Sequence, residues 1–342
     1  MTVEVATRKA SRGRGLVPAL LALILLLALS SLAVGPAPIP VFAAAKALVS
    51  DQGSASVIVR DIRLPRTLLA VLIGGTLGVT GAALQGLLRN PLADSTVFGA
   101  PQAAALGAVL VLYFGLADAL SWTLPLAAIL GALVSIALVV AVAGREGGTL
   151  VLVLAGLAVG SLAGAATSLA ISHSPNPFAV TEIVFWLLGS LEDRSMVHVM
   201  LAAPFLIAAS GALLATGPAL RALSLGEETA ESLGVNVGQT RLLIVAASAV
   251  GAGASVAVAG AIGFVGLVAP HLVRPLVGHD PDRALLPAGL AGAALLTAAD
   301  CAVRLIPSAV EVRIGVLTAV LGVPVFLWII ARRRSALAEA PA

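Results

Sequence analysis

Asp300 and Arg304 are the residues that could do chemistry inside the apolar part of this chain. Asp300 is the one carboxylate expected within a membrane-crossing segment, and Arg304 follows it by one helical turn. Residues four apart share one side of a helix, so this pair is expected to neutralise itself near the outer surface. The four histidines have no metal-ligand spacing, and His271 is expected to make structural hydrogen bonds.

The sequence has few of the patterns that mark an enzyme. No GxSxG, HExxH or Walker A sequence occurs, and the single cysteine, Cys301, excludes a disulfide framework and a cysteine metal cluster. We therefore expect no catalytic residue, no metal site and no cofactor. An intramembrane enzyme that uses Asp300 or His271 is the alternative from that class.

The source of energy can also be argued from these residues. A carrier driven by protons or sodium usually keeps carboxylates near the middle of the membrane. This chain lacks them, so the energy is expected to come from a partner protein. A stand-alone secondary carrier or channel is the alternative.

The composition indicates a polytopic helical membrane protein. Of the 342 residues, 59% are hydrophobic and 11% are charged, and the mean hydropathy is +1.08. Basic residues gather near both ends, at Arg8, Lys9, Arg12, Arg14 and 332–334. By the positive-inside rule both termini are cytoplasmic, which requires an even number of spans. A signal peptide is the alternative for the first apolar run, and a first membrane helix is favoured.

The apolar segments predict ten spans, joined by short loops. They are expected at 16–34, 64–87, 96–114, 122–143, 149–171, 196–216, 242–262, 263–278, 284–303 and 314–331. The stretch 172–190 is expected to be external or re-entrant, with Trp186 near the interface. The domain plan is a basic tail over 1–15, a transmembrane domain over 16–334 with a cytoplasmic loop at 217–241, and a second tail over 335–342.

The second span is built for close helix packing. Gly74, Gly75, Gly78 and Gly81 lie within an uncharged run, and small residues let membrane helices approach closely. Gly81-Ala82 is followed by Pro91, as Gly260-Ala261 is by Pro270. This offset joins spans two and seven, five spans apart, and predicts an inverted repeat of the kind found in transporters.

The cytoplasmic loop carries a short acidic segment between Gly226 and Gly234. We expect a helix with Leu225, Ala230 and Leu233 on one side. A solvated loop helix explains the pattern equally well as a helix that docks in a groove of another protein. The spacing Glu228-x-Ala230-x3-Gly234 is similar to the loop by which importer permeases seat on their ATPases, with Thr229 in place of one alanine.

Several longer motifs make the resemblance specific. They are R63-L-P-R66, Q85-x3-R89-N-P-L-A-D94, the 223–238 loop, G263-F-V-G-L-V-A-P-H-L-V-R274 and the run 314–328. In this order they resemble the FecCD type of ABC importer permease, which takes up ferric siderophores, haem or cobalamin. The resemblance implies an all-α type II importer fold in the cytoplasmic membrane. It also implies a second permease subunit, homo- or heterodimeric, two ATPase subunits and a periplasmic or lipid-anchored binding protein.

The resemblance also implies roles for particular residues. Arg63, Arg66 and Arg304 match external arginines that receive carboxylates of the binding protein, and plain interfacial anchoring is the alternative. Thr149 matches a cytoplasmic gate position, although Gly148 and Leu150 stand where the family pattern has hydroxyl residues. The residues expected to couple to the ATPase are Leu225, Gly226, Glu227, Glu228, Ala230, Leu233 and Gly234.

These implications combine into one expected function. The chain is expected to be a non-enzymatic permease that moves an iron chelate, a ferric siderophore first, with haem and cobalamin as the alternatives within the family. Asn90 and Pro91 are expected to shape the turn between spans two and three and not to touch the cargo.

Overall fold

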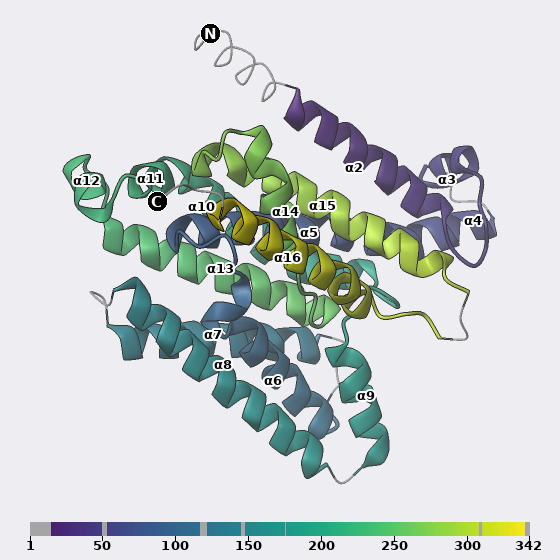
Figure 1. Ribbon diagram of the computed structural model, residues 1–342. Helices are drawn as coiled ribbons and strands as arrows, with labels where there is room; N and C mark the ends of the chain where they lie inside the picture. Colours follow the sequence, from purple (N-terminus) through teal and green to yellow (C-terminus); the bar gives the residue numbers. More distant parts are fainter. Residues whose placement is uncertain are drawn as a thin grey trace.

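A computed structural model describes residues 15–49, 53–116, 122–144, 148–174, 176–307 and 310–338, and side chains up to residue 327. All regular structure in these ranges is helical, which confirms the expected fold class (Figure 1). The helices are α2 (Leu16–Ala33), α3 (Val41–Ala47), α4 (Ser54–Val57), the π-helix η1 (Ile58–Arg63), α5 (Leu64–Leu87), the 3-10 helix η2 (Ser95–Phe98), α6 (Ala100–Tyr113), α7 (Thr123–Ala143), α8 (Thr149–Ser172), α9 (Pro177–Leu187), α10 (Met196–Ala215), α11 (Gly217–Leu223), α12 (Glu227–Ser232), α13 (Val237–Ala259), α14 (Val265–Val273), the 3-10 helix η3 (Arg274–Leu276), α15 (Pro281–Leu305) and α16 (Ile314–Ala338).

Each of the ten expected spans coincides with a helix. In the described ranges 7 helices are long and apolar enough to cross a membrane, namely α2, α5 with its preceding turns, α7, α8, α10, α13 and α15. The spans at α6, α14 and α16 are shorter apolar helices. The seventh span was expected from residue 242, but α13 begins at Val237, because the Asn236 side chain accepts a hydrogen bond from the backbone N–H of Gln239.

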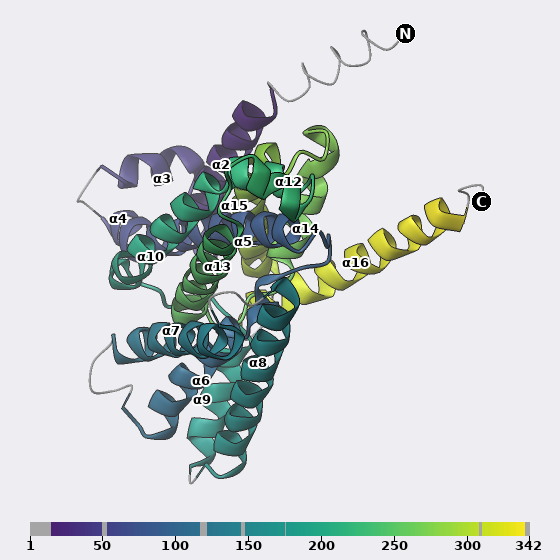
Figure 2. The same cartoon turned by 90° about the vertical axis from the view of Figure 1, so that its left-hand side faces the viewer.

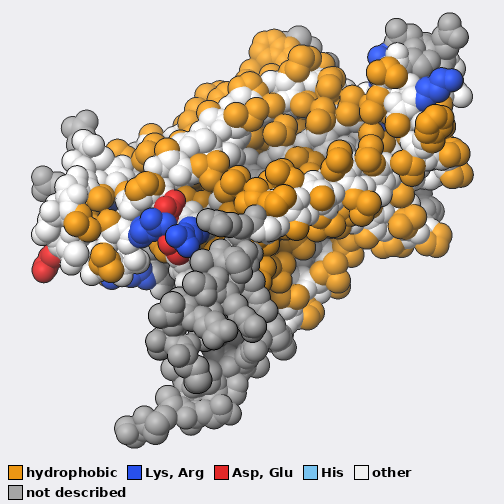
Figure 3. Space-filling model, turned by 90° about the horizontal axis from the view of Figure 1, so that it is seen from above, with side chains coloured by type: hydrophobic (Ala, Val, Ile, Leu, Met, Phe, Trp, Pro, Cys, Tyr) orange, Lys and Arg blue, Asp and Glu red, His pale blue; other side chains and the backbone are white. Residues whose placement is uncertain are grey.

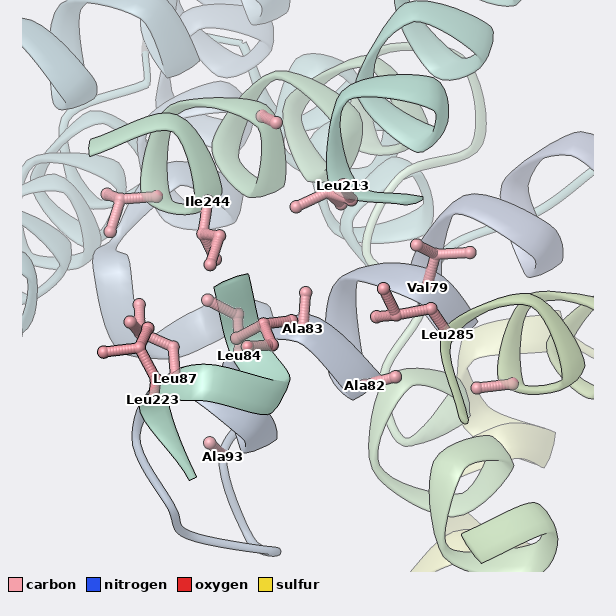
Figure 4. Close-up of a cluster of buried hydrophobic side chains, with 14 of the residues drawn as sticks. Val79, Ala82, Ala83, Leu84, Leu87, Ala93, Leu213, Leu223, Ile244 and Leu285 are labelled. Atoms are coloured by element: carbon pink, nitrogen blue, oxygen red, sulfur yellow. The ribbon is translucent and has the colours of Figure 1, made fainter. Parts of the chain in front are cut away.

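Helices α5 and α13 form the core of the subunit. In each of them 78% of the most apolar window is buried, against 28% in α8 and α10. Close approach of backbones makes this possible: a Cβ added to Gly81 would lie 1.7 Å from the carbonyl oxygen of Gly266 in α14. Side chains from α5, α10, α11, α13 and α15 then fill the inner half of the core, as the close-up of Val79, Leu213, Ile244 and Leu285 shows (Figure 4).

The helices α5 to α8 form one half of the subunit and α13 to α16 the other, and the two halves pack in corresponding ways. Helix α5 packs against α14 and α15, as α13 packs against α6 and α7. Helix α6 packs against α7 and α8, as α14 does against α15 and α16. A residue with left-handed backbone precedes each short helix, Gly99 (φ 69) before α6 and Phe264 (φ 66) before α14. This correspondence supports the inverted repeat that the Gly-Ala and Pro spacing predicts.

Helix α9 occupies the stretch expected to be external or re-entrant. Its Trp186 packs against apolar clusters that include Val109 and Ile129, and this short apolar helix lies against α6. Helix α16 has fewer neighbours and extends away from the other helices (Figure 2). Apolar side chains cover most of the face in Figure 3, and charged side chains gather toward two opposite ends of it. This distribution fits a molecule whose middle lies in hydrocarbon.

Candidate functional site

Five charged residues meet at the outer end of α5 and α15 and are called the outer arginine cluster: Arg63, Arg66, Asp300, Arg304 and Glu311. Arg66 Nε lies 2.7 Å from Asp300 Oδ1, and Arg304 Nη2 lies 2.8 Å from Asp300 Oδ2. Arg66 also donates to both carboxylate oxygens of Glu311, through Nη1 at 3.0 Å to Oε2 and through Nη2 to Oε1. The expected pairing of Asp300 with Arg304 is therefore present, within a larger ionic network.

Two of these arginines hold the outer end of α2. Arg63 Nη1 donates to the carbonyl oxygens of Leu32 and Ala33 at 2.8 Å, and Arg304 Nη1 donates to Ser31 at 2.8 Å and Val34 at 3.0 Å. The last carbonyls of a helix have no partner within the helix, and they carry the negative end of its dipole. The two guanidinium groups supply both the missing donors and the opposite charge.

The three arginines are largely buried within the subunit. The exposed fractions of Arg63 and Arg66 are 4% and 7%, and that of the Arg304 side chain is 3%, whereas docking of a carboxylate requires an accessible guanidinium. Their donors already serve acceptors of the same subunit. An anchoring role is thus visible, and docking of a binding protein stays a prediction.

A second ion pair joins the start of α16 to the segment between α9 and α10. Arg313 Nη1 lies 2.8 Å from Glu192 Oε2, and the Arg313 guanidinium stands 5.1 Å from the centroid of the Phe185 ring. No local sequence pattern predicts this contact, because 121 residues separate its two partners. This ion pair and the Arg66–Glu311 pair hold the segment before α16 on two sides.

The inner end of the subunit carries the acidic loop. Helix α12 forms there between Gly226 (φ 121) and Gly234 (φ 85), backbone conformations that favour glycine. The three apolar residues do not share one side as expected: Ala230 is buried, whereas Leu225 and Leu233 are 65% and 63% exposed. Both leucines border a hollow of about 720 Å³ between α11 and the start of α13.

Three arginines tie this loop to the helices around it. Arg241 Nη2 of α13 lies 2.9 Å from Glu227 Oε1, and Arg89 donates to the carbonyl oxygen of Leu223 at the end of α11. Arg221 of α11 lies 2.8 Å from Asp280 Oδ2 and 2.9 Å from Asp282 Oδ2, before and within the first turn of α15. The remaining acidic residues of α12, Glu228 and Glu231, are exposed.

The other predicted positions lie where the sequence places them. Thr149 is the first residue of α8 and is half-buried, while Leu150 beside it is 70% exposed. The gate role stays a prediction. Asn90 accepts a hydrogen bond from the Leu92 backbone N–H at 3.0 Å, which shapes the turn before Pro91 as expected. Among the described residues no group of three or more His, Cys, Asp or Glu side chains could hold a metal ion.

Comparison with known proteins gives the family. The model of the FecCD transport family matches residues 22–332. The cobalamin import system permease protein BtuC of Halobacterium salinarum is 40% identical over 283 residues, which is 82% of this chain and 75% of that protein. The hemin transport system permease protein HmuU of Yersinia pestis is 40% identical over 280 residues, 80% of this chain and 83% of that protein.

A solved structure agrees with this assignment. It shows an inward-facing conformation of a proposed metal-chelate type ABC transporter, with a TM-score of 0.82, 30% identity and coverage of 93% of this chain and 99% of that one. The order of the spans, the helical loop at the inner end and these similarities lead to the same result. This chain belongs to the FecCD transport family and is the membrane-spanning permease subunit of an ABC importer, in which a separate ATPase hydrolyses the ATP.

Proposed function

We propose that this permease carries a metal chelate of the size of cobalamin, haem or a ferric siderophore. A ferric siderophore is the expectation from the sequence. Relatives named for cobalamin and for hemin are each 40% identical over at least 80% of the chain, which supports a tetrapyrrole cargo. We therefore place cobalamin or haem first and a ferric siderophore second.

The ATPase is proposed to seat on α12 and the hollow beside it. The observation that carries this proposal is the exposure of Leu225 and Leu233 next to an open hollow at the inner end. Exposed leucines beside a concave surface are suited to contact with another protein. Glu228 and Glu231 add negative charge at the rim, which a basic surface of the partner would complement.

A second permease subunit is proposed to pack on α8 and α16. Helix α8 exposes Leu150, Leu154, Leu157 and Leu162, and α16 exposes Val320, Leu321 and Leu327. Helix α16 packs mainly against α14 and α15 and extends from the rest of the subunit (Figure 2). A cargo path between two copies would leave each subunit with such an incompletely packed face. The binding protein is proposed to deliver cargo at the outer end of the subunit, opposite to the inner end where the ATPase is proposed to bind.

Reconstitution in liposomes tests this function. The permease would be combined with its ATPase and binding protein, and labelled cyanocobalamin, hemin and a ferric hydroxamate siderophore would be offered separately. We expect ATP-dependent uptake of one tetrapyrrole, and no uptake when the ATPase or the binding protein is omitted. Uptake by the permease alone would contradict the proposal and favour a secondary carrier. Uptake of the siderophore alone would reverse the order of the cargoes.

A further inference from the structure

The coupling helix α12 is too short to be held by its own hydrogen bonds. It has six residues, and an isolated helix of that length is unstable in water. Its main contacts are with α11 and with the start of α13. Only Ala230 of its residues is buried, so apolar packing holds it at a single point. Polar contacts must therefore fix most of its position.

One such contact joins α12 to the core helix α13. Glu227 is the first residue of α12, and its Oε1 lies 2.9 Å from Nη2 of Arg241 in the second turn of α13. The Arg241 side chain is 9% exposed and the Glu227 side chain 56%, so the pair lies at the edge of the protein with its arginine inside. Glu227 is one of the residues predicted to couple to the ATPase, and in this structure its carboxylate pairs with Arg241 of its own subunit.

A second contact joins the same loop to the other core helix, α5. Arg89 follows α5 with a left-handed backbone (φ 48) that is uncommon outside glycine and asparagine. Its guanidinium donates to the carbonyl oxygen of Leu223, the last residue of α11. That carbonyl also accepts a hydrogen bond from the Gly226 backbone N–H at 3.1 Å, and a cation is favourable at this end of a helix.

The two arginines thus connect one loop to both halves of the inverted repeat. Helices α5 and α13 are the corresponding helices of the two halves; α5 ends and α13 begins at the inner end, beside this loop. A displacement of α11 and α12 would pull on both at once through charged contacts, which are stronger than neutral hydrogen bonds. The apolar packing of α11 through Leu220 and Leu223 also joins the loop to the core, whereas α12 itself buries only Ala230, so movement of α12 reaches α13 mainly through the Glu227–Arg241 pair.

We propose that Arg89 and Arg241 are positioning residues that transmit movement of the α11–α12 loop to α5 and α13. This inference rests on the proposed role of α12 as the seat of the ATPase. It assigns different tasks to neighbouring glutamates: Glu227 faces inward and holds Arg241, and Glu228 faces outward toward the partner. Seating and transmission are then separable by substitution.

The test measures seating and transmission in the same complex. Permease variants Arg241→Ala, Glu227→Ala and Arg89→Ala would be co-purified with the ATPase and the binding protein and placed in liposomes. The readouts are the amount of ATPase retained, the rate of ATP hydrolysis, and uptake per ATP of labelled cyanocobalamin, hemin or ferric siderophore, whichever the wild type carries. Arg283→Ala is the matched control, because this arginine is on the same end, its side chain is 68% exposed, and its 3.6 Å pair with Asp280 stays within the start of α15.

We expect the three variants to retain the ATPase and to lose at least about five-fold in uptake per ATP, a typical scale for coupling between sites. The double variant Glu227→Arg/Arg241→Glu should recover most of that loss, because it restores the pair with the charges exchanged. Unchanged uptake per ATP in Arg241→Ala and Arg89→Ala would overturn the inference. Failure of the charge exchange to recover uptake, with the ATPase still retained, would overturn it for Glu227 and Arg241. Failure of the wild type itself to retain the ATPase would instead overturn the proposed function.

Discussion

Arg66 and Asp300 form a buried ion pair, 2.7 Å between Nε and Oδ1, that joins α5 to α15 at the outer end of the subunit. The Asp300 side chain is fully buried, and Arg304 approaches its other oxygen at 2.8 Å. A buried charge pair contributes little beyond a well-packed apolar pair, but loss of one partner leaves an uncompensated charge. The stability of this end therefore depends on Asp300.

Substitution of Asp300 is expected to be severe. Asp300→Asn leaves Arg66 and Arg304 without their shared carboxylate and should cost about 3–5 kcal/mol of stability. Glu192→Gln is the control. Glu192 and Arg313 form a partly exposed ion pair, and loss of such a pair costs about 0–1 kcal/mol of stability. Thermal unfolding in detergent measures both. Equal melting temperatures for the two variants would contradict the buried role of Asp300.

Arg63 is expected to control the order of the outer end of α2. Arg63→Ala removes the donors to Leu32 and Ala33 and should increase hydrogen exchange over residues 31–38. Arg63→Lys should recover only part of the protection, because an ammonium group cannot reproduce the planar fork of guanidinium donors. Exchange followed by mass spectrometry tests this. Unchanged exchange in Arg63→Ala would show that other contacts hold α2.

Glu311 allows the docking prediction to be tested without removing an arginine. It occupies Arg66 through two oxygens and is itself 19% exposed at its side chain. If a carboxylate of the binding protein pairs with Arg66, it must compete with Glu311, and Glu311→Gln should tighten association by about ten-fold. Affinity would be measured at low and high salt. Unchanged affinity, together with unchanged association in Arg63→Glu/Arg66→Glu, would leave these arginines as anchors only.

Gly81 is expected to tolerate no side chain. Gly81→Ala places a Cβ 1.7 Å from the Gly266 carbonyl oxygen, and both atoms belong to rigid helices, so α5 and α14 would have to separate. The expected result is loss of folded protein in the membrane fraction. Gly211→Ala in α10 is the control, because nothing lies within 4 Å of an added Cβ there, and it should stabilise by about 0.5–1 kcal/mol. Normal yield of Gly81→Ala would show that the contact is looser than described.

Asp94 predicts a pH dependence of stability. Desolvation raises the pKa of Asp94 above its ordinary value, and hydrogen bonds from the Ser95 backbone and side chain only partly oppose this. A carboxyl with a raised folded-state pKa contributes stability below its unfolded pKa, and this contribution is lost as the pH rises through the folded pKa. Asp94→Asn should therefore raise the melting temperature at pH 7.5, on the order of 2 °C, and not near pH 4. An equal change at both pH values would contradict this account.

Much of the fold could be predicted from the sequence. Hydropathy and the positive residues at the ends place the ten spans, because backbone in a membrane must satisfy its own hydrogen bonds and leaves few alternatives. The start of α13 could also have been read, since Asn236 is a preferred N-cap residue before an apolar run. Asp300 and Arg304 could be paired because they are neighbours on one helix.

The partners of the arginines could not be predicted in the same way. Arg66 and Glu311 lie 245 residues apart, and no local pattern relates them. The sequence around an arginine at the end of a span does not reveal whether its guanidinium points to solvent or to the carbonyl groups of another helix. The distinction depends on how α2 and α15 pack around α5, which is settled only by the tertiary fold. The pairing of Glu227 with Arg241 could not be predicted for the same reason.

The correspondence of the two halves has a consequence for how the molecule can be studied. Several helix pairs in one half have a counterpart in the other, so the subunit contains its own internal comparison. At Gly99 an added Cβ would meet the Gly156 carbonyl oxygen of α8 at 2.6 Å, whereas at the equivalent place the Phe264 side chain fills the space beside Gly322 of α16. Gly99 and Phe264 are therefore corresponding positions at which the two halves differ in side-chain bulk.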